Sequence, residues 1–420
     1  MRTTNRVAIA ALAAAALALT ACGGGDSGGG DSGGGQSAGQ TIKLGVLTSL
    51  SGSTAAGFVD VEGGVKARLS AYKDGDGKCA STDVEVIMGD DASSPQGALT
   101  ATQKLVQQDK VYALMPIDSF FSGAAQYAST QAKSTPVVGT SFDGAPQWVD
   151  PKVTNFFSAD GSTDYRNVPD TYGQYWKAIG GTKVAVVGVA TPSSAQAATG
   201  ALASGVAAGL TEGYQNVALP IGSTDVGAIV LGIKDSGADV LYMPVTPQTA
   251  FAIVGGLKQA GVTLKSVLVP TGYGADLLAN PPALQAAAGV GFITTTAPTE
   301  LNTEATQAQS EALKKYAGAE FDDPSFSAGV GWKAADLFLY GLEQAGCDAS
   351  QADYMDALEK SKTWDAGGLY SEPVDFSEVG NLASAHGPGN CFYVSIAEGD
   401  GFKPDPEASP ICGEIIDKQG

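Results

Sequence analysis

Serine and threonine side chains gather in six turns that each follow a predicted strand. These turns cover residues 48–52, 116–122, 140–143, 191–194, 246–249 and 271–273. Hydroxyl groups and the free N–H groups at helix starts can satisfy a small anion such as a carboxylate, and nearby aromatic rings can cover an apolar part. One such turn could simply cap a helix, because Ser and Thr are common N-caps. Six of them at one predicted sheet edge indicate a ligand site.

Residue types that perform catalysis are scarce. The single histidine, His386, lies in a Gly/Pro turn, and the sequence has no GxSxG elbow and no cluster with metal-ligand spacing. The stretch Asp74–Gly77 begins like a calcium loop, but Cys79 stands where that loop needs a glycine. We therefore expect no enzyme, no metal and no cofactor. An exported hydrolase that uses a serine or a carboxylate pair is the enzymatic alternative.

The composition excludes further classes. Of the 420 residues, 44% are hydrophobic, so buried cores can form and two to three domains are expected. Lys and Arg number 24 against 44 Asp and Glu, which gives a net charge of −20. Such an acidic chain is a poor ligand for nucleic acid or for an anionic membrane surface, because both require basic residues.

Strand and helix patterns alternate from residue 41 onward. The run Lys183–Val189 is apolar throughout, as expected for a parallel strand that is covered on both faces. Helical spacing marks Val61–Lys73, Pro95–Asp109 and Phe326–Ala345, and the end, Tyr370–Ala397, is typical of two strands joined by a Gly-rich loop. The pattern predicts an α/β fold with two doubly wound, Rossmann-like lobes. Ligands of such sheets bind beyond the carboxyl ends of the strands, where the six turns lie.

The N-terminus is typical of an export signal. Residues 1–21 combine Arg2 and Arg6 with an apolar stretch that is too short to span a bilayer. The segment Leu19-Thr20-Ala21-Cys22 resembles a bacterial lipobox, which implies lipidation of Cys22 and anchoring to the cell membrane; an ordinary secretory signal is the alternative. Residues 22–40 form a Gly/Ser-rich tether. A phosphate-binding Gly loop is disfavoured there because no Lys-Ser/Thr follows.

Four further cysteines suggest two disulfides in an exported chain. Three pairings are possible. We favour Cys391 with Cys412, which are close in sequence, and this leaves Cys79 with Cys347.

The order of motifs along residues 41–400 resembles type I periplasmic binding proteins, in the leucine/isoleucine/valine-binding branch of ABC-transporter solute receptors. The matching segments are GVLTSLSG, GDDASSPQGALTATQKLVQQDKVYAL, TPVVGTS, KVAVVGV, GADVLYM with GGLKQAG, FSAGVGWKAADLF, and PVDFSEVGN with FYVSI. The resemblance implies two lobes joined by a three-strand hinge. Lobe one would comprise residues 41–157 plus 297–365, and lobe two residues 158–296 plus 366–420.

The resemblance also implies where the ligand binds. The turns after the third and fourth strands would bind a carboxylate, and the first turn would line a side-chain pocket. The residues implied in lobe one are Ser49, Ser51, Phe58, Asp118, Ser119, Ser122, Thr140 and Ser141; those in lobe two are Thr191, Ser194, Thr246, Gln248 and Tyr273.

One departure bears on the ligand. The family often has an acidic residue, which pairs with an α-ammonium group, where this chain has Gln248. A neutral amide cannot neutralise a buried ammonium. Asp118 or Asp143 could substitute for it; otherwise a urea, an amide or a small organic acid remains open.

The function implied is a monomeric, lipid-anchored, extracytoplasmic protein that captures a small polar molecule and delivers it to an ABC permease. A receptor of the same fold that serves a signalling partner is the alternative.

Overall fold

The computed structural model describes residues 41–160, 166–378 and 390–418. The first sheet is parallel, in the order β2-β1-β3-β4-β5. Its strands are β1 (Ile42–Thr48), β2 (Val84–Asp90), β3 (Ala113–Pro116), β4 (Val137–Gly139) and β5 (Phe156–Ser158). The carboxyl ends of β1, β3 and β4 are therefore neighbours.

The second sheet runs in the order β13-β12-β11-β10-β9-β7-β8. Its parallel strands are β7 (Lys183–Val189), β8 (Thr211–Leu219), β9 (Val240–Tyr242), β10 (Ser266–Val269) and β11 (Gly291–Thr294). The antiparallel strands β12 (Cys391–Glu398) and β13 (Gly401–Pro404) extend it, and β14 (Ile411–Cys412) also pairs with β12. A separate pair joins β6 (Asn167–Pro169) to β15 (Ile415–Lys418).

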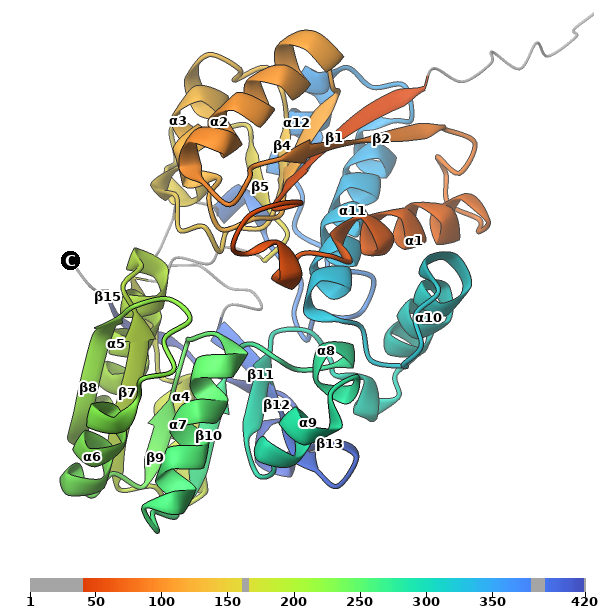
Figure 1. Cartoon of the computed structure of the whole chain (residues 1–420). Coiled ribbons are helices and arrows are strands. Elements are labelled where there is room, and N and C mark those ends of the chain that lie inside the picture. Colours follow the sequence, from red (N-terminus) through yellow and green to blue (C-terminus); the bar gives the residue numbers. More distant parts are fainter. Residues whose placement is uncertain (1–40, 161–165, 379–389, 419–420) are drawn as a thin grey trace, which may run out of the picture. The chain divides into compact units, whose positions relative to one another are not determined.

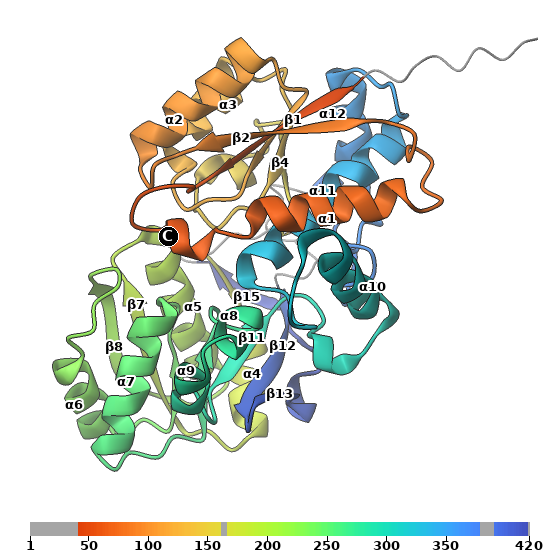
Figure 2. The same cartoon turned by 45° about the vertical axis from the view of Figure 1, so that its right-hand side comes forward.

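Helices cover both faces of each sheet (Figures 1 and 2). With the first sheet lie α1 (Val61–Lys73), α2 (Pro95–Lys104), α3 (Ser122–Thr130), α10 (Glu304–Ala312), α11 (Phe326–Ala345) and α12 (Gln351–Glu359). With the second lie α4 (Thr171–Ala178), α5 (Pro192–Ala207), α6 (Gly227–Ser236), α7 (Pro247–Gln259), α8 (Ala275–Leu278) and α9 (Pro281–Ala286). We call these two assemblies the first and the second lobe.

Each sheet separates two apolar clusters, as expected when parallel strands are buried on both faces. In the first lobe, Val46 of β1 faces the cluster of α1, α11 and α12, whereas Leu47 faces that of α2 and α3. The first of these clusters extends along the chain to Phe376. In the second lobe, one cluster lies with α6 to α9 and the other with α4 and α5. The predicted α/β fold is confirmed.

Two disulfides join Cys79 to Cys347 and Cys391 to Cys412, which is the pairing favoured from the sequence. Cys391 and Cys412 lie opposite each other on β12 and β14. Within the described ranges, no helix has the length and apolar character needed to cross a bilayer.

Some predicted elements differ from the structure. The helix expected over 95–109 turns into a π-helix over Leu105–Asp109, and Lys110 ends it in the left-handed conformation. Of the two strands expected in 370–397, the described residues include one, β12; Tyr370 makes only an isolated bridge to Thr296. The Gly-rich loop expected between them, with His386, lies largely outside the described residues.

Candidate functional site

Three of the predicted turns meet at the carboxyl edge of the first sheet. The backbone N–H of Ile117 bonds to Leu47 across β1 and β3 at 2.8 Å, and that of Thr140 bonds to Pro116 across β3 and β4 at 2.9 Å. The parallel strand order therefore brings together the turns after β1, β3 and β4, as the sequence predicted for a doubly wound sheet.

The serine hydroxyls in the turn after β1 donate hydrogen bonds to carboxylates at the end of β2. Ser49 Oγ donates to Asp91 at 3.0 Å, and Ser51 Oγ donates to Asp90 at 2.6 Å. Burial alone would raise the pKa of Asp90, but hydrogen bonds from Ser51 and from backbone N–H groups lower it on balance. Ser49 is buried and Ser51 is exposed, so of these two hydroxyls that of Ser51 lies at the surface.

The turn after β3 combines a buried carboxyl with exposed hydroxyls. Asp118 is 1% exposed; its Oδ1 accepts the Phe120 N–H at 2.5 Å, while no described donor reaches Oδ2. Burial, followed by the neighbouring Asp91, raises the pKa of Asp118 well above its usual value. Burial and the raised pKa of Asp118 thus both disfavour the ionised form that would pair with an ammonium group.

Ser119 and Ser122 of the same turn are both exposed. They flank the start of α3, whose N-cap position is Phe121 and which has no side-chain cap. The N–H groups of Gly123 and Ala124 donate to the carbonyls of Phe120 and Phe121 at 2.9 and 2.7 Å, so the helix start contributes mainly its partial positive charge, and the two hydroxyls remain as exposed donors. Two exposed hydroxyls beside an uncapped helix start form an arrangement that suits a carboxylate or another polar acceptor.

The turn after β4 is held by internal bonds. Ser141 Oγ lies 3.0 Å from Ser158 Oγ, and the Ser141 N–H donates to Asp160 at 3.0 Å. Thr140 is buried, and its hydroxyl points toward the carbonyl of Pro116. Next in the turn, Asp143 accepts the indole N–H of Trp148 at 2.7 Å. Burial raises the pKa of Asp143 to about 7 despite this bond.

Three aromatic rings stand beside these turns. Phe142 of the β4 turn lies 6.1 Å from Phe58 and 6.1 Å from Phe326 at the start of α11, measured between ring centroids. Phe58 is buried, whereas Phe142 and Phe326 are half-buried. We call Phe58, Phe142 and Phe326 the aromatic wall; it is able to cover an apolar portion of a ligand.

Most hydroxyls in the second-lobe turns form hydrogen bonds within the lobe, to backbone groups or to one another. Thr191 caps α5, and Ser194 Oγ donates to the Pro244 carbonyl at 2.6 Å. Thr246 Oγ1 lies 3.1 Å from Thr249 Oγ1. By contrast, Gln248 is exposed in the first turn of α7.

The two lobes approach each other near the β4 turn. A Cβ placed on Gly144 would lie 3.4 Å from the Cβ of Ser193 in the second lobe. Gly144 has a φ of +74°, which favours glycine.

Tyr273, also predicted for the site, uses its hydroxyl for hydrogen bonds to neighbouring residues of the protein. Its hydroxyl lies 2.9 Å from Glu300 and 3.1 Å from Asp323, and it accepts the Thr299 N–H at 3.1 Å. Glu300 and Asp323 border an open cavity of about 540 Å³. The pKa values of both carboxyls are raised, mainly by burial.

Metal binding finds no support among the described residues. The one group of His, Cys, Asp and Glu whose ligand atoms converge contains Glu372, Cys391 and Cys412. The two cysteines are joined in a disulfide, so they offer no thiolate.

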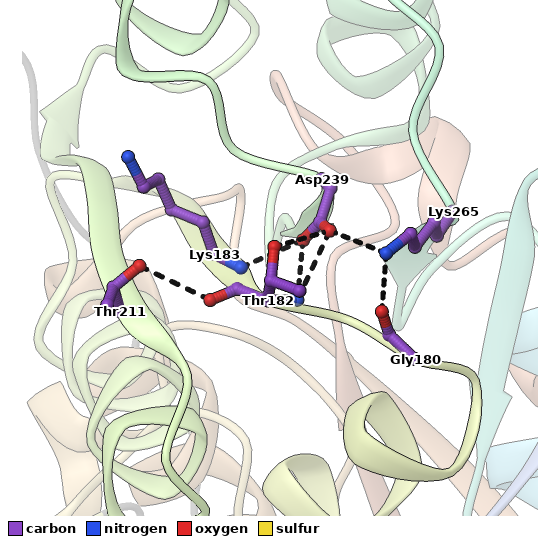
Figure 3. Close-up of polar contacts among 6 residues, drawn as sticks. All are labelled: Gly180, Thr182, Lys183, Thr211, Asp239 and Lys265. Atoms are coloured by element: carbon purple, nitrogen blue, oxygen red, sulfur yellow. Dashed lines mark hydrogen bonds and ion pairs between the residues drawn. The ribbon is translucent and has the colours of Figure 1, made fainter.

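Figure 3 shows a dense polar cluster at the opposite, amino-terminal edge of the second sheet. Asp239, which precedes β9, accepts hydrogen bonds from the N–H groups of Thr182 and Lys183 at 2.9 and 2.8 Å, and pairs with Lys265 at 2.9 Å. Burial alone would raise the pKa of Asp239, but these donors lower it strongly. Because ligands bind at the carboxyl ends of such sheets, we assign this cluster to stability.

Lys333 of α11 and Asp160 lie near the site and were not predicted. The Lys333 ammonium pairs with Asp160 at 2.7 Å, and Asp160 also accepts the N–H of Ser141. The sequence carried one signal for Lys333: a lysine within the apolar run GVGWKAADLF.

The periplasmic binding protein family matches residues 41–401 of this chain. No curated protein shows significant similarity to it. A solute-binding protein of an ABC transporter from R. palustris, in complex with benzoate, is 18% identical, with a TM-score of 0.72 over 91% of this chain and 99% of that one. A leucine-binding protein from Thermotoga maritima is 17% identical, with a TM-score of 0.67 over 87% and 97%. These likenesses confirm the two-lobed fold that the resemblance implied.

Proposed function

This chain belongs to the periplasmic binding protein family, and on that premise we propose that it captures a small solute between its two lobes outside the cytoplasm. Delivery of that solute to an ABC permease is part of the proposal. The observation that carries it is the uncapped start of α3, where the exposed Ser119 and Ser122 lie in the turn after β3.

The solute we propose is a small organic acid with an apolar part. The α3 start suits a carboxylate, and the aromatic wall suits an apolar group. One structural relative, solved with benzoate, supports this class, whereas another, named leucine-binding, represents the α-amino acid alternative. An α-amino acid is less well matched, because burial disfavours the ionised form of Asp118 and Gln248 carries no charge.

Capture works by a population shift. A solute that contacts both lobes binds the closed arrangement more tightly than the open one, and so it increases the population of the closed state. Beside the site, the Gly144 turn of the first lobe approaches Ser193 of the second, and Asp276 of the second lobe accepts the N–H of Phe326 at 2.9 Å. The permease would then recognise the closed form.

The membrane anchor remains a proposal from the sequence. Cleavage after residue 21 and lipidation of Cys22 would leave residues 23–40 as a tether to the folded part. These residues lie outside the described ranges.

The test is thermal unfolding of residues 23–420 with benzoate, 4-hydroxybenzoate, leucine, urea, acetamide and glucose. A compound at about 100 times its Kd adds roughly 2.7 kcal/mol of stability, which shifts the midpoint visibly. We expect an organic acid to give the largest shift. If only leucine acts, the solute class is wrong; if no small molecule acts and none copurifies, the capture proposal itself fails.

A matched pair of variants locates the binding group. Replacing Ser119 and Ser122 by Ala should weaken binding of the active compound by at least about tenfold, because hydrogen bonds to charged groups are worth about 1.5–3 kcal/mol each. Ser129→Ala is the control, since Ser129 lies near the other end of α3 and its hydroxyl bonds to the backbone of Gln126. Equal binding by both variants would remove the α3 start from the site.

A further inference from the structure

Lys333 is a lysine inside an apolar helix face. It is 6% exposed in α11 and lies among Trp332, Ala334 and Ala335, which all belong to the core of the first lobe. A buried ammonium without a partner is strongly unfavourable, so its placement requires an anion. Asp160 supplies it: Nζ lies 2.7 Å from Oδ1. Burial alone would lower the pKa of Lys333, but the Asp160 carboxylate raises it on balance, so the lysine stays charged.

The other oxygen of Asp160 holds a turn of the proposed solute site. Oδ2 accepts the backbone N–H of Ser141 at 3.0 Å. Ser158 reinforces this contact, because its Oγ lies 3.0 Å from Ser141 Oγ and accepts the Asp160 N–H at 3.1 Å. The position of Ser141, and of Phe142 after it, therefore depends on the orientation of the Asp160 carboxylate, which the ion pair with Lys333 holds in place.

The same lysine lies at the junction of the segments that leave and re-enter the first lobe. Its Nζ is 5.5 Å from the ring centroid of Tyr370, and the Tyr370 hydroxyl donates to the carbonyl of Ala159. Tyr370 pairs in an antiparallel bridge with Thr296, and the Ala297 N–H donates to Leu369 at 2.7 Å. Segments 159–160, 296–297 and 369–370 thus meet beside Lys333, although they are far apart in the sequence.

We propose that Lys333 is a positioning residue, which through Asp160 fixes the Ser141 turn and ties it to the junction of the three inter-lobe segments. A solute that binds this turn then contacts residues that Lys333 and Asp160 connect to the inter-lobe segments. A movement of the lobes must change the contacts of those same residues. The inference rests on the proposed function for the solute, but the positioning itself is a property of the chain alone.

Hydrogen exchange, read by mass spectrometry on the full chain without solute, tests the positioning. Lys333→Met should speed exchange by roughly tenfold in two places at once: the turn at 137–145, and the segments at 294–298 and 368–374. The control is Arg68→Met. Arg68 pairs with Asp336, also of α11, at 2.7 Å with similarly low exposure, but it has no contact with Ser141 or Tyr370 among those described. Arg68→Met should leave the turn at 137–145 at the rate of the parent chain; its partner Asp336 accepts the indole N–H of Trp364, which packs on Tyr370, so the turn is the region that distinguishes the two variants.

A second variant guards against a simple failure to fold. Lys333→Met with Asp160→Asn removes both charges at nearly constant volume, which buried pairs often tolerate. The double variant should melt near the parent chain and still exchange faster in both regions. Parent-like protection of 137–145 in this variant, or equal loss of protection of that turn in Arg68→Met, would overturn the proposal.

A final measurement separates this inference from the proposed function. With benzoate added, the parent chain should gain protection in the turn and in the junction segments, whereas the double variant should gain it in the turn only. If benzoate protects nothing but the solute-free results are as expected, the solute class fails and the positioning role stands. If benzoate protects both regions equally in the double variant, the coupling is refuted although solute capture stands.

Discussion

Asp143 should make the binding of an anionic solute depend on pH near neutrality. Burial raises the pKa of this carboxyl to about 7, and the group belongs to the turn after β4. The acidic side chains that interact electrostatically with Asp143 are Asp118 and Asp160, and Asp160 is paired with Lys333. An ionised Asp143 therefore adds a negative charge beside the proposed carboxylate site, whereas the protonated form does not.

The expected size follows from two estimates. Two like charges about 5 Å apart repel by roughly 3 kcal/mol at an effective dielectric constant of about 20, which is more than a hundredfold in affinity. Binding then proceeds almost entirely through the protonated form, so the apparent Kd rises with the ionised fraction. For a pKa of about 7, benzoate should bind about tenfold more weakly at pH 8 than at pH 6.

The assay is calorimetric titration with benzoate, which stays ionised throughout, at several pH values from 5.5 to 8.5. Asp143→Asn keeps an oxygen to accept the Trp148 N–H and removes the titrating group, so its affinity should be flat over this range. A flat profile in the parent chain, or an unchanged slope in Asp143→Asn, would refute the reasoning. An affinity that rises with pH would indicate a cationic group on the solute instead.

Two further predictions concern stability, measured by urea denaturation. Gly64→Ala should destabilise the chain by roughly 2–4 kcal/mol, because the new Cβ would clash with the carbonyl oxygen of Ala328 in α11. The control Gly63→Ala should be close to neutral, because its Cβ would lie 3.5 Å from that of Ala317. Equal losses of stability in both variants would refute the close contact between the helices. Asp239→Ala should cost roughly 1–3 kcal/mol at pH 7 through its lost hydrogen bonds. Because its folded pKa is lowered, this contribution is present above the unfolded pKa of about 3.9 and should fade as pH falls below it; a loss that is constant down to pH 2 would contradict the assignment.

Elements with a strong apolar pattern could be predicted from the sequence closely. Lys183–Val189 and Phe326–Ala345 form with the expected bounds, because each is buried along most of its length and its pattern has one consistent solution. Strand β8 was not predicted. Its residues, TEGYQNVAL, are largely polar, as expected for an edge strand of which only Leu219 is buried, and its pairing with β7 is a tertiary effect.

The location of the site could be predicted from the sequence, but the side chains that remain available to a ligand could not. Parallel topology determines which turns meet, so the turns after β1, β3 and β4 could be named from the strand order alone. The role of each hydroxyl could not, because a serine can bond equally well to a ligand or to its own fold. Ser194 and Ser49 do the latter, whereas Ser119 and Ser122 remain exposed. Lys333 needed the tertiary structure, since its partner lies 173 positions earlier.

The discontinuous cores have a consequence for the order in which the chain folds. The main core of the first lobe combines β1 with α11 and α12, and the Cys79–Cys347 disulfide spans 268 positions. The second lobe also needs Phe392 and Val394 from β12 to complete one of its cores. A chain that folds from its N-terminus onward can therefore complete neither lobe before its C-terminal part is available. Two continuous stretches can begin to fold locally before that: β1 to β5, which holds the whole of the α2 and α3 cluster, and β7 to β11.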